Sequence, residues 1–262
     1  MIYQRMKTFG SITQAEKMKA SDLNLSELAK ELSQDKLLVI RGLAPLSSEE
    51  FLSLCSRFEG VSPMSWSFGP VMEMKESQDP ENYLFSRERV PFHWDGAFYK
   101  VPDYLVFCCI EAPTENAGGE TLFTSTTKIL ADASPAQLDV WQRMILTFET
   151  EKRAHYGGKI QGPLVQKHPH TKQNILRFAE AVETELNPVS LQISGVSNDE
   201  ASSALTELTQ KIYDPLYCYS HKWQVGDLIF ADNHSLIHGR TAFELNCPRH
   251  LRRIQLIANL KE

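Results

Sequence analysis

The last quarter of the chain constrains the fold most, because short strand-like runs follow one another there with almost no residues between them. The runs cover residues 217–224, 226–233, 235–243 and 249–260, and brief connections with Gly, Asp, Asn or Pro join them. Such short connections can join antiparallel strands, whereas parallel strands need a crossover of about a dozen residues or more. We therefore expect a mainly β fold, a double-sheet jelly roll, with helices packed outside it.

Helix signals lie between the other strand-like runs. Each expected helix starts with a Ser or Asn followed three residues later by Glu or Gln, which is the pattern of a capping box. The expected helices are 24–33, 46–58, 134–144 and 197–213. Further strands are expected at 36–42, 102–113, 118–125 and 174–179, and polar composition predicts long loops at 72–83 and 152–170.

Size and composition limit the classes of function. The 262 residues are expected to form one domain, residues 1–262, and a net charge of −6 argues against a nucleic-acid partner. The five cysteines are odd in number and form no CxxC pair, so we expect free thiols in a reducing compartment. The N-terminus lacks the apolar core of a signal peptide, and the longest apolar run, 104–110, is far shorter than a membrane span. We expect a cytoplasmic protein with no membrane contact.

The stretch "VPFHWDGAFY" at 90–99 carries the first chemical signal. On an extended segment, His93 and Asp95 point to the same face because residues i and i+2 do so. Two histidines and one carboxylate on one face of an octahedron hold iron(II) in non-heme oxygenases. A lone His-x-Asp is weak evidence, and the alternative is a hydrogen-bonded histidine near a turn.

A second histidine would have to come from a distant strand. His238 follows an apolar run and precedes Gly239, which allows close approach of another backbone. His234 is the competitor, but it follows Asp232-Asn233, a turn-like pair, and is interpreted as a turn residue.

Three arginines on an otherwise apolar strand suggest an anion site. Arg249 and Arg253 are four residues apart and share a face, roughly 13 Å from one another at a strand's usual rise. That separation suits two anions in one cavity better than one carboxylate held by both. Arg252 points the other way and is expected to be structural. The alternative is a solvated basic edge strand, which the flanking apolar residues disfavour.

Together these motifs resemble a known family. His93-x-Asp95, "GGET" (118–121), "WQVGDLIFADN" (223–233), His238-Gly239-Arg240 and Arg249 are similar to the taurine dioxygenase (TauD/TfdA) family. Its members are iron(II)- and 2-oxoglutarate-dependent dioxygenases with a double-stranded β-helix fold, cupin-like. The resemblance runs from about residue 36 to the end of the chain and agrees with the expected jelly roll.

The resemblance implies roles for single residues. It implies that His93, Asp95 and His238 bind Fe(II), and that Arg249 and Thr121 bind the distal carboxylate of 2-oxoglutarate, with O2 as the other cosubstrate. It also implies that Arg253 faces an acidic substrate. Halogenating members of the family lack the carboxylate ligand, so Asp95 implies hydroxylation or desaturation.

A closer resemblance concerns the substrate. "MSWSFGPVMEM" (64–74), "VPFHWDGAFY", "AHYGG" (154–158), "ILRFAE" (175–180) and "PRHLRRIQLIA" (248–258) resemble the PvcB-type oxygenases of isonitrile (isocyanide) biosynthesis. That resemblance implies desaturation of a 2-isocyano-3-arylpropanoate made from Tyr or Trp, with or without decarboxylation, and an isonitrile synthase as functional partner. Candidate substrate residues are Arg253, Arg89, Trp66, Phe68, Phe98, Tyr99, Tyr104, His155 and Tyr156. Each aromatic could equally be core packing, and Arg89 a solvated loop residue.

Two other functions remain open from the sequence. One is a TauD-like hydroxylase of another small anion, such as a sulfonate or an amino-acid derivative, and the other is a non-catalytic metal-binding domain. His168-Pro169-His170 is a weak second metal motif, because no acid or cysteine near it in the sequence completes it. Neither the choice between phenol and indole nor the oligomeric state, with a homo-oligomer as one option, follows from the residues.

Overall fold

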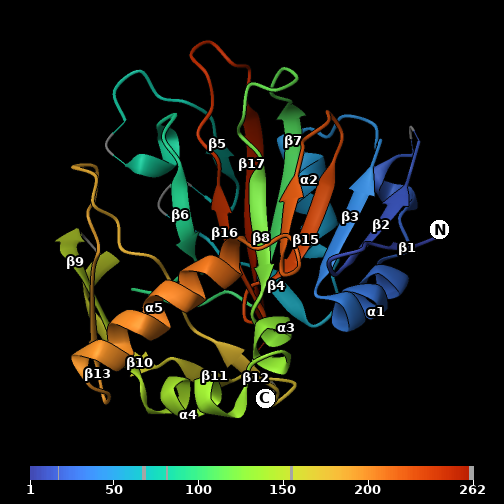
Figure 1. Cartoon of the computed structure of the whole chain (residues 1–262). Coiled ribbons are helices and arrows are strands. Elements are labelled where there is room, and N and C mark those ends of the chain that lie inside the picture. The colour runs from blue at the N-terminus through green and yellow to red at the C-terminus, as the bar shows by residue number, and fades with distance from the viewer. Residues whose placement is uncertain (17, 67–68, 81, 154–155, 260–262) are drawn as a thin grey trace.

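Two β-sheets form the frame of the molecule (Figure 1). The computed structural model describes residues 1–16, 18–66, 69–80, 82–153 and 156–259. The large sheet has the order β1-β2-β3-β15-β7-β17-β4, with β5 paired to β17, and the small sheet has the order β14-β8-β16-β6. The strands of the large sheet are β1 (Gln4–Arg5), β2 (Ser11–Gln14), β3 (Leu37–Arg41), β4 (Val61–Pro63), β5 (Met72–Met74), β7 (Tyr104–Glu111), β15 (Leu228–Asp232) and β17 (His250–Ala258). The strands of the small sheet are β6 (Val90–His93), β8 (Thr121–Ser125), β14 (Cys218–His221) and β16 (Leu236–Arg240).

A shared core joins the two sheets. Val39, Phe107 and Ile229 of the large sheet pack in one buried cluster with Phe123 and Leu236 of the small sheet. Consecutive short strands thus alternate between the sheets, as β14, β15, β16 and β17 do. This arrangement confirms the expected double-stranded β-helix. The one parallel pair is β2 with β3 among the described strands.

Helices cover the outer faces of this frame. They are α1 (Leu25–Asp35), α2 (Ser48–Ser56), α3 (Thr126–Ala131), α4 (Pro135–Arg143) and α5 (Asn198–Tyr213), with short 3-10 turns η1 (Ala20–Asp22) and η2 (Tyr83–Phe85). The four expected helices are confirmed, and Ser47, Ser134 and Ser197 each form the capping box that the sequence predicts. Apolar side chains of α2 pack on the large sheet, and those of α5 pack in the cluster that contains β6.

The prediction of a long loop at 152–170 is wrong for most of its length. β9 (Ile145–Arg153) pairs with β10 (Tyr156–Pro163) and β13 (Ser190–Ser194), while β11 (Val165–Lys167) pairs with β12 (Asn174–Leu176). Side chains of β10 are at most half-buried, so its polar residues face solvent and mimic a loop in composition. In a sheet with one solvent-exposed face, apolar and polar residues normally alternate along each strand. Glycines interrupt this alternation in β10, so its sequence does not look like that of a strand. No helix in the described ranges is both long and apolar enough to cross a membrane.

Candidate active site

The end of β6 and the middle of β16 bring two histidines together. His93 is the last residue of β6 and pairs across the small sheet with His238 of β16. The strands approach closely beside this pair, because a Cβ on Gly239 would lie 2.8 Å from the carbonyl oxygen of Val90. Only glycine fits such an approach, as expected from His238-Gly239.

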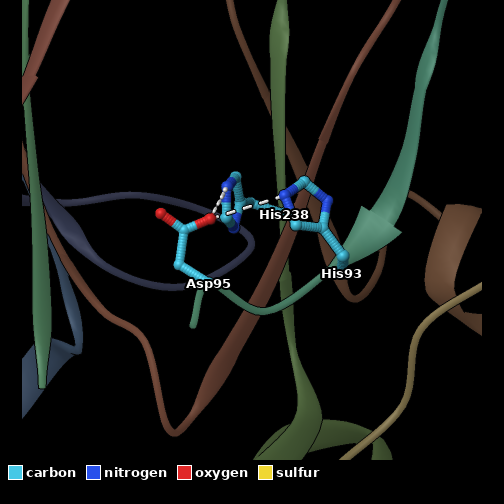
Figure 2. Close-up of side chains that lie close together, drawn as sticks. All are labelled: His93, Asp95 and His238. Carbon is cyan, nitrogen blue, oxygen red and sulfur yellow. Dashed lines mark ion pairs between the residues drawn. The ribbon is translucent and has the colours of Figure 1, made fainter. Parts of the chain in front are cut away.

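The carboxylate of Asp95 lies against both histidines (Figure 2). Asp95 Oδ1 is 3.5 Å from His93 Nε2 and 3.6 Å from His238 Nε2. The Nδ1 of His93 is 2.9 Å from the carbonyl oxygen of Pro91, which can only accept a hydrogen bond. Nδ1 therefore carries a hydrogen, and Nε2 is the nitrogen that faces Asp95 and His238.

The other oxygen of Asp95 is held by the protein. Asp95 Oδ2 is 2.8 Å from Arg253 Nη1 and accepts a hydrogen bond of 2.5 Å from Gln255 Nε2. Burial alone would raise the pKa of Asp95, but Arg253, His93 and His238 outweigh burial and hold this pKa below its ordinary value. Burial and the neighbouring His93 lower the pKa of His238 to about 3. The carboxylate is thus charged and the His238 ring neutral at neutral pH.

The three side chains fit a divalent metal. One ligand atom from each lies within 4.8 Å of the others. Two neutral imidazoles and one carboxylate oxygen are the donor set that holds iron(II) and leaves other positions open. Asp95 Oδ1 and the Nε2 atoms are the free donors, because Oδ2 and Nδ1 of His93 are already bonded to the protein.

A second charged site lies next to this donor set. Arg249 is only 5% exposed, and among the described residues no carboxylate pairs with it. Its Nε donates to the carbonyl oxygen of Gly119, and its Nη2 is 3.5 Å from Thr121 Oγ1. Burial lowers the pKa of Arg249 to about 9, so the side chain still carries its charge at neutral pH. A buried cation without a counter-charge is costly, and a bound carboxylate would remove that cost.

Thr121 is oriented to donate to the same carboxylate. Its Oγ1 accepts a hydrogen bond of 3.0 Å from Trp223 Nε1. Because an indole can only donate, the hydroxyl hydrogen of Thr121 stays available. The sequence suggests only a packing role for Trp223, and its bond to Thr121 is a finding of the structure. A Cβ on Gly119 would lie 2.9 Å from Arg249 Cδ, which explains the second glycine of "GGET".

One cavity of about 400 Å³ opens onto the metal-ligand set. Its volume lies within the range of small-molecule sites. Its wall consists of Trp66, Met72, Asn82, Leu84, Phe85, His93, Asp95, Gly96, Tyr99, Tyr156, Asn187, Arg253 and Gln255. Arg253 and Gln255 lie at the end beside Asp95, and aromatic rings form much of the remaining wall. The rings of Trp66 and Tyr99 are in contact, with centroids 5.4 Å apart.

The structure places four of the expected substrate residues in this wall and others elsewhere. Trp66, Tyr99, Tyr156 and Arg253 line the cavity. Phe98 lies behind the wall, packed edge-on against the ring of Tyr156 with centroids 5.4 Å apart. Phe68 and His155 lie outside the described residues.

Arg89 and Tyr104 do not line the cavity. Arg89 is half-exposed, binds Glu180 with an Nη2 to Oε1 distance of 2.9 Å, and lines a separate surface groove. Tyr104 belongs to β7 and packs with the cluster under α2. Burial, Asp232 and Asp103 raise the pKa of Tyr104 to about 12. Neither side chain can reach a ligand in the cavity without leaving these contacts.

Three side chains at or next to the site are not among the candidates that the sequence suggests. Gln255 shares a face of β17 with Arg253 because it lies two residues further on, so strand alternation could have found it. Asn233 holds the backbone of Asp95 at both polar groups, accepting from the Asp95 N–H and donating to its carbonyl oxygen. Asn187 comes from a loop before β13, and nothing in its local sequence connects it to the metal ligands.

A second group of metal-ligating residues surrounds His170. The sequence shows no acid beside the His168-Pro169-His170 motif, but folding brings Asp103 to it. Asp103 Oδ1 lies 2.5 Å from His170 Nε2 and 2.9 Å from His234 Nε2. Arg177 Nη2, which can only donate, is 2.7 Å from His234 Nδ1. His234 therefore carries its hydrogen on Nε2, where it donates to Asp103, and this group is a hydrogen-bonded network rather than a set of free donors.

Comparisons with known proteins agree with this geometry. The model of the family "Taurine catabolism dioxygenase TauD, TfdA family" matches residues 5–255. The chain is 40% identical over 255 residues to the 3-((Z)-2-isocyanoethenyl)-1H-indole synthase of Fischerella ambigua, covering 95% of this chain and 93% of that protein. It is 37% identical over 228 residues to the tyrosine isonitrile desaturase of Pseudomonas aeruginosa, covering 85% of this chain and 77% of that protein. A solved structure of PvcB, described as an Fe, alpha-ketoglutarate dependent oxygenase from an isonitrile synthetic pathway, superposes with a TM-score of 0.79 at 31% identity, covering 98% of this chain and 90% of that one.

Proposed function

This chain belongs to the TauD, TfdA family, and from that premise we propose that it desaturates an aryl isonitrile carboxylate, a 2-isocyano-3-arylpropanoate. It is a dioxygenase that depends on iron(II) and 2-oxoglutarate. The observation that carries the substrate proposal is the cavity, in which an arginine beside the metal ligands faces a wall of aromatic rings. The relatives named for isonitrile formation support the same substrate class.

Each end of the site has a defined task in this proposal. His93, Asp95 Oδ1 and His238 would hold the iron, while Arg249 and Thr121 would bind the distal carboxylate of 2-oxoglutarate. Iron with 2-oxoglutarate and O2 supplies the oxidation, and the cosubstrate ends as succinate and carbon dioxide. In desaturation the substrate gives up two hydrogens, one atom of O2 enters succinate, and the other leaves as water.

Arg253 would bind the substrate carboxylate. Its Nη1 is engaged by Asp95, whereas its Nη2 has one hydrogen-bond partner among the described residues, the thioether of Met72 at 3.1 Å. A thioether is a weak acceptor, so a carboxylate entering the cavity would replace it with a charge-assisted bond. Anchoring the carboxylate here and the ring between Trp66, Tyr99 and Tyr156 would hold the benzylic C–H near the metal ligands and keep water out.

The proposal also implies a reaction that precedes this one. An isonitrile synthase acting on Tyr or Trp would supply the substrate, as the isonitrile pathway of the PvcB relative suggests. Mass analysis of the product will show whether the carboxylate is kept or lost. The cytoplasmic location stays a prediction.

Two measurements test the function. Protein with iron(II) and 2-oxoglutarate under anaerobic conditions should show the visible charge-transfer band of the family, and His93→Ala or His238→Ala should abolish it. Incubation with tyrosine isonitrile and O2 should then give a product lighter by two hydrogens, or by carbon dioxide and two hydrogens. A product heavier by one oxygen would instead support the hydroxylase alternative. Succinate formation without any change in the isonitrile would contradict the substrate proposal.

A further inference from the structure

Asn187 places an amide in the cavity wall that has no partner among the described residues. Its side chain is 5% exposed and lines the cavity that contains His93 and Asp95. Its backbone N–H donates to the carbonyl oxygen of Glu185, but its carboxamide has no hydrogen-bond partner among the described residues. An amide in the wall of a ligand cavity that has no protein partner is free to bond a polar atom of the ligand, and such polar groups fix the ligand's orientation.

The loop that carries Asn187 is built to hold it in place. Val182 and Val189 form a two-way backbone bridge that closes the loop between β12 and β13. Asn187 has a left-handed backbone with φ of 61°, a conformation that Asn tolerates better than most residues. The side chain is thus fixed by the backbone before a ligand arrives.

The neighbouring wall adds a second amide. Asn82 lines the same cavity, and its Oδ1 accepts the backbone N–H of Leu84 at 2.9 Å. Its Nδ2 has no hydrogen-bond partner in the described part of the chain and can only donate. Among the amides on this side of the cavity, Asn187 therefore offers an acceptor, and Asn187 and Asn82 both offer donors.

We propose that Asn187 binds the ring hydroxyl of a phenolic substrate and so makes the enzyme selective for the tyrosine-derived isonitrile. This inference rests on the proposed function and names the substrate within that class. A phenol hydroxyl donates to Asn187 Oδ1 and also accepts from an amide donor. An indole N–H can only donate and leaves the amide donors unpaired. Arg253 binds the carboxylate at the other end of the substrate. The substrate is therefore held at two points, its ring hydroxyl and its carboxylate.

The test compares three isonitriles on the holoenzyme. Dissociation constants for tyrosine, phenylalanine and tryptophan isonitrile are measured anaerobically, with iron(II) and 2-oxoglutarate bound, from the change in the charge-transfer band. The wild type should bind tyrosine isonitrile about tenfold to a hundredfold more tightly than phenylalanine isonitrile, because a site built to bind a hydroxyl rejects the analogue that lacks it. Asn187→Gly removes the amide, suits the left-handed backbone, and should abolish this preference while leaving the affinity for phenylalanine isonitrile within about threefold.

Asn246→Gly is the matched control, since Asn246 has the same left-handed backbone with φ of 62° but is exposed outside the cavity. It should keep the wild-type preference. Equal binding of all three ligands by the wild type, tightest binding of tryptophan isonitrile, or an unchanged preference in Asn187→Gly would overturn the assignment while leaving the proposed function intact. Failure of the wild type to bind or oxidise any of the three would instead reject the proposed function itself.

Discussion

At the scale of single residues, the two oxygens of Asp95 have different tasks. Oδ1 faces the two histidines, and Oδ2 is held by Arg253 and Gln255. The backbone of the same residue is held by Asn233. Replacing a group that orients a ligand in this way typically lowers metal affinity about 10–100-fold.

Replacing Gln255 should therefore weaken metal binding. Gln255→Leu keeps the approximate size but removes the donor to Asp95 Oδ2, so we expect about a tenfold loss of affinity for Co(II), used as a stand-in for iron(II) and measured by titration of its visible absorption. Gln192→Leu on the exposed face of β13 is the control and should bind Co(II) like the wild type. Equal affinities in the two variants would contradict a positioning role for Gln255.

Replacing Arg249 should act on the cosubstrate instead. Arg249→Met removes the guanidinium beside Thr121 and should raise the dissociation constant of 2-oxoglutarate about tenfold to a hundredfold, since bonds to charged groups contribute roughly 1.5–3 kcal/mol. The measurement is calorimetric titration of 2-oxoglutarate into the metal-loaded protein. Arg252→Met is the control, because Arg252 bonds to Glu73 and Leu46 on the other face of the strand. An Arg249→Met protein with wild-type affinity would refute the assignment.

The residue scale also shows what the sequence can reveal about a site. His93, Asp95 and His238 were predictable because few residue types bind iron and their spacing fits two strands. An anion site near Arg249 was predictable because three arginines interrupt an otherwise apolar strand, while the role of Arg249 itself came from the family resemblance. Asn187 was not, because a neutral amide in a loop is common, and only the fold shows that it lines the cavity beside the metal ligands.

At the scale of elements, Arg240 joins the metal strand to the cavity wall. Arg240 ends β16, two residues after His238, and its guanidinium donates to the carbonyl oxygens of Leu84, Ser86 and Glu88. Burial lowers the pKa of Arg240 to about 10, so the side chain remains charged at neutral pH. The segment 84–88 contributes Leu84 and Phe85 to the cavity, so one side chain connects the metal site with the substrate wall.

Arg240→Met should loosen that wall. Three carbonyl oxygens lose a charged donor, and we expect the protein to lose about 2–3 kcal/mol of stability and the segment 84–88 to exchange its amide hydrogens faster. Hydrogen-exchange mass spectrometry and thermal melting measure both effects. Arg143→Met is the control, because Arg143 bonds Asp139 and Glu200 at the surface of the helical layer. Unchanged exchange at 84–88 in Arg240→Met would show that other contacts hold the segment.

Some helices and strands can be predicted from the sequence more easily than others. The helices starting after Ser47, Ser134 and Ser197 were predictable because the cap and the third helical residue bond each other locally. β10 was not, because its pairing with β9 is not visible in a polar segment that contains Gly157, Gly158 and Gly162. The helices can thus be predicted from local sequence signals, whereas the strands of the outer sheet depend on pairing between segments that are distant in the sequence.

At the scale of the whole molecule, buried neutral histidines join distant parts of the chain. His221 bonds Asp227 beside the cosubstrate region, His234 bonds Asp103 at the turn before β16, and His238 lies at the metal site. Burial is the largest cause of a lowered pKa in each, and for His238 the value falls to about 3. In the folded protein these three histidines therefore bind a proton less readily than the same histidines do in the unfolded chain.

Acid should destabilise the metal-free protein for this reason. Below the ordinary histidine pKa of about 6.5, the unfolded state binds protons that the native state does not, so the free energy of unfolding falls as the pH falls. A histidine with a lowered native pKa contributes at most about 1.4 kcal/mol per pH unit, and only between the ordinary value and its own native pKa. The lowered carboxylate pKa values act in the same direction only near pH 4 and below, so between pH 5.5 and 7.5 the histidines dominate. Urea unfolding at pH 7.5, 6.5 and 5.5 should show little change in the first interval and a clear loss in the second, and His221→Gln should make the loss smaller. A stability that stays constant or rises toward pH 5.5 would contradict the burial of neutral histidines as the cause.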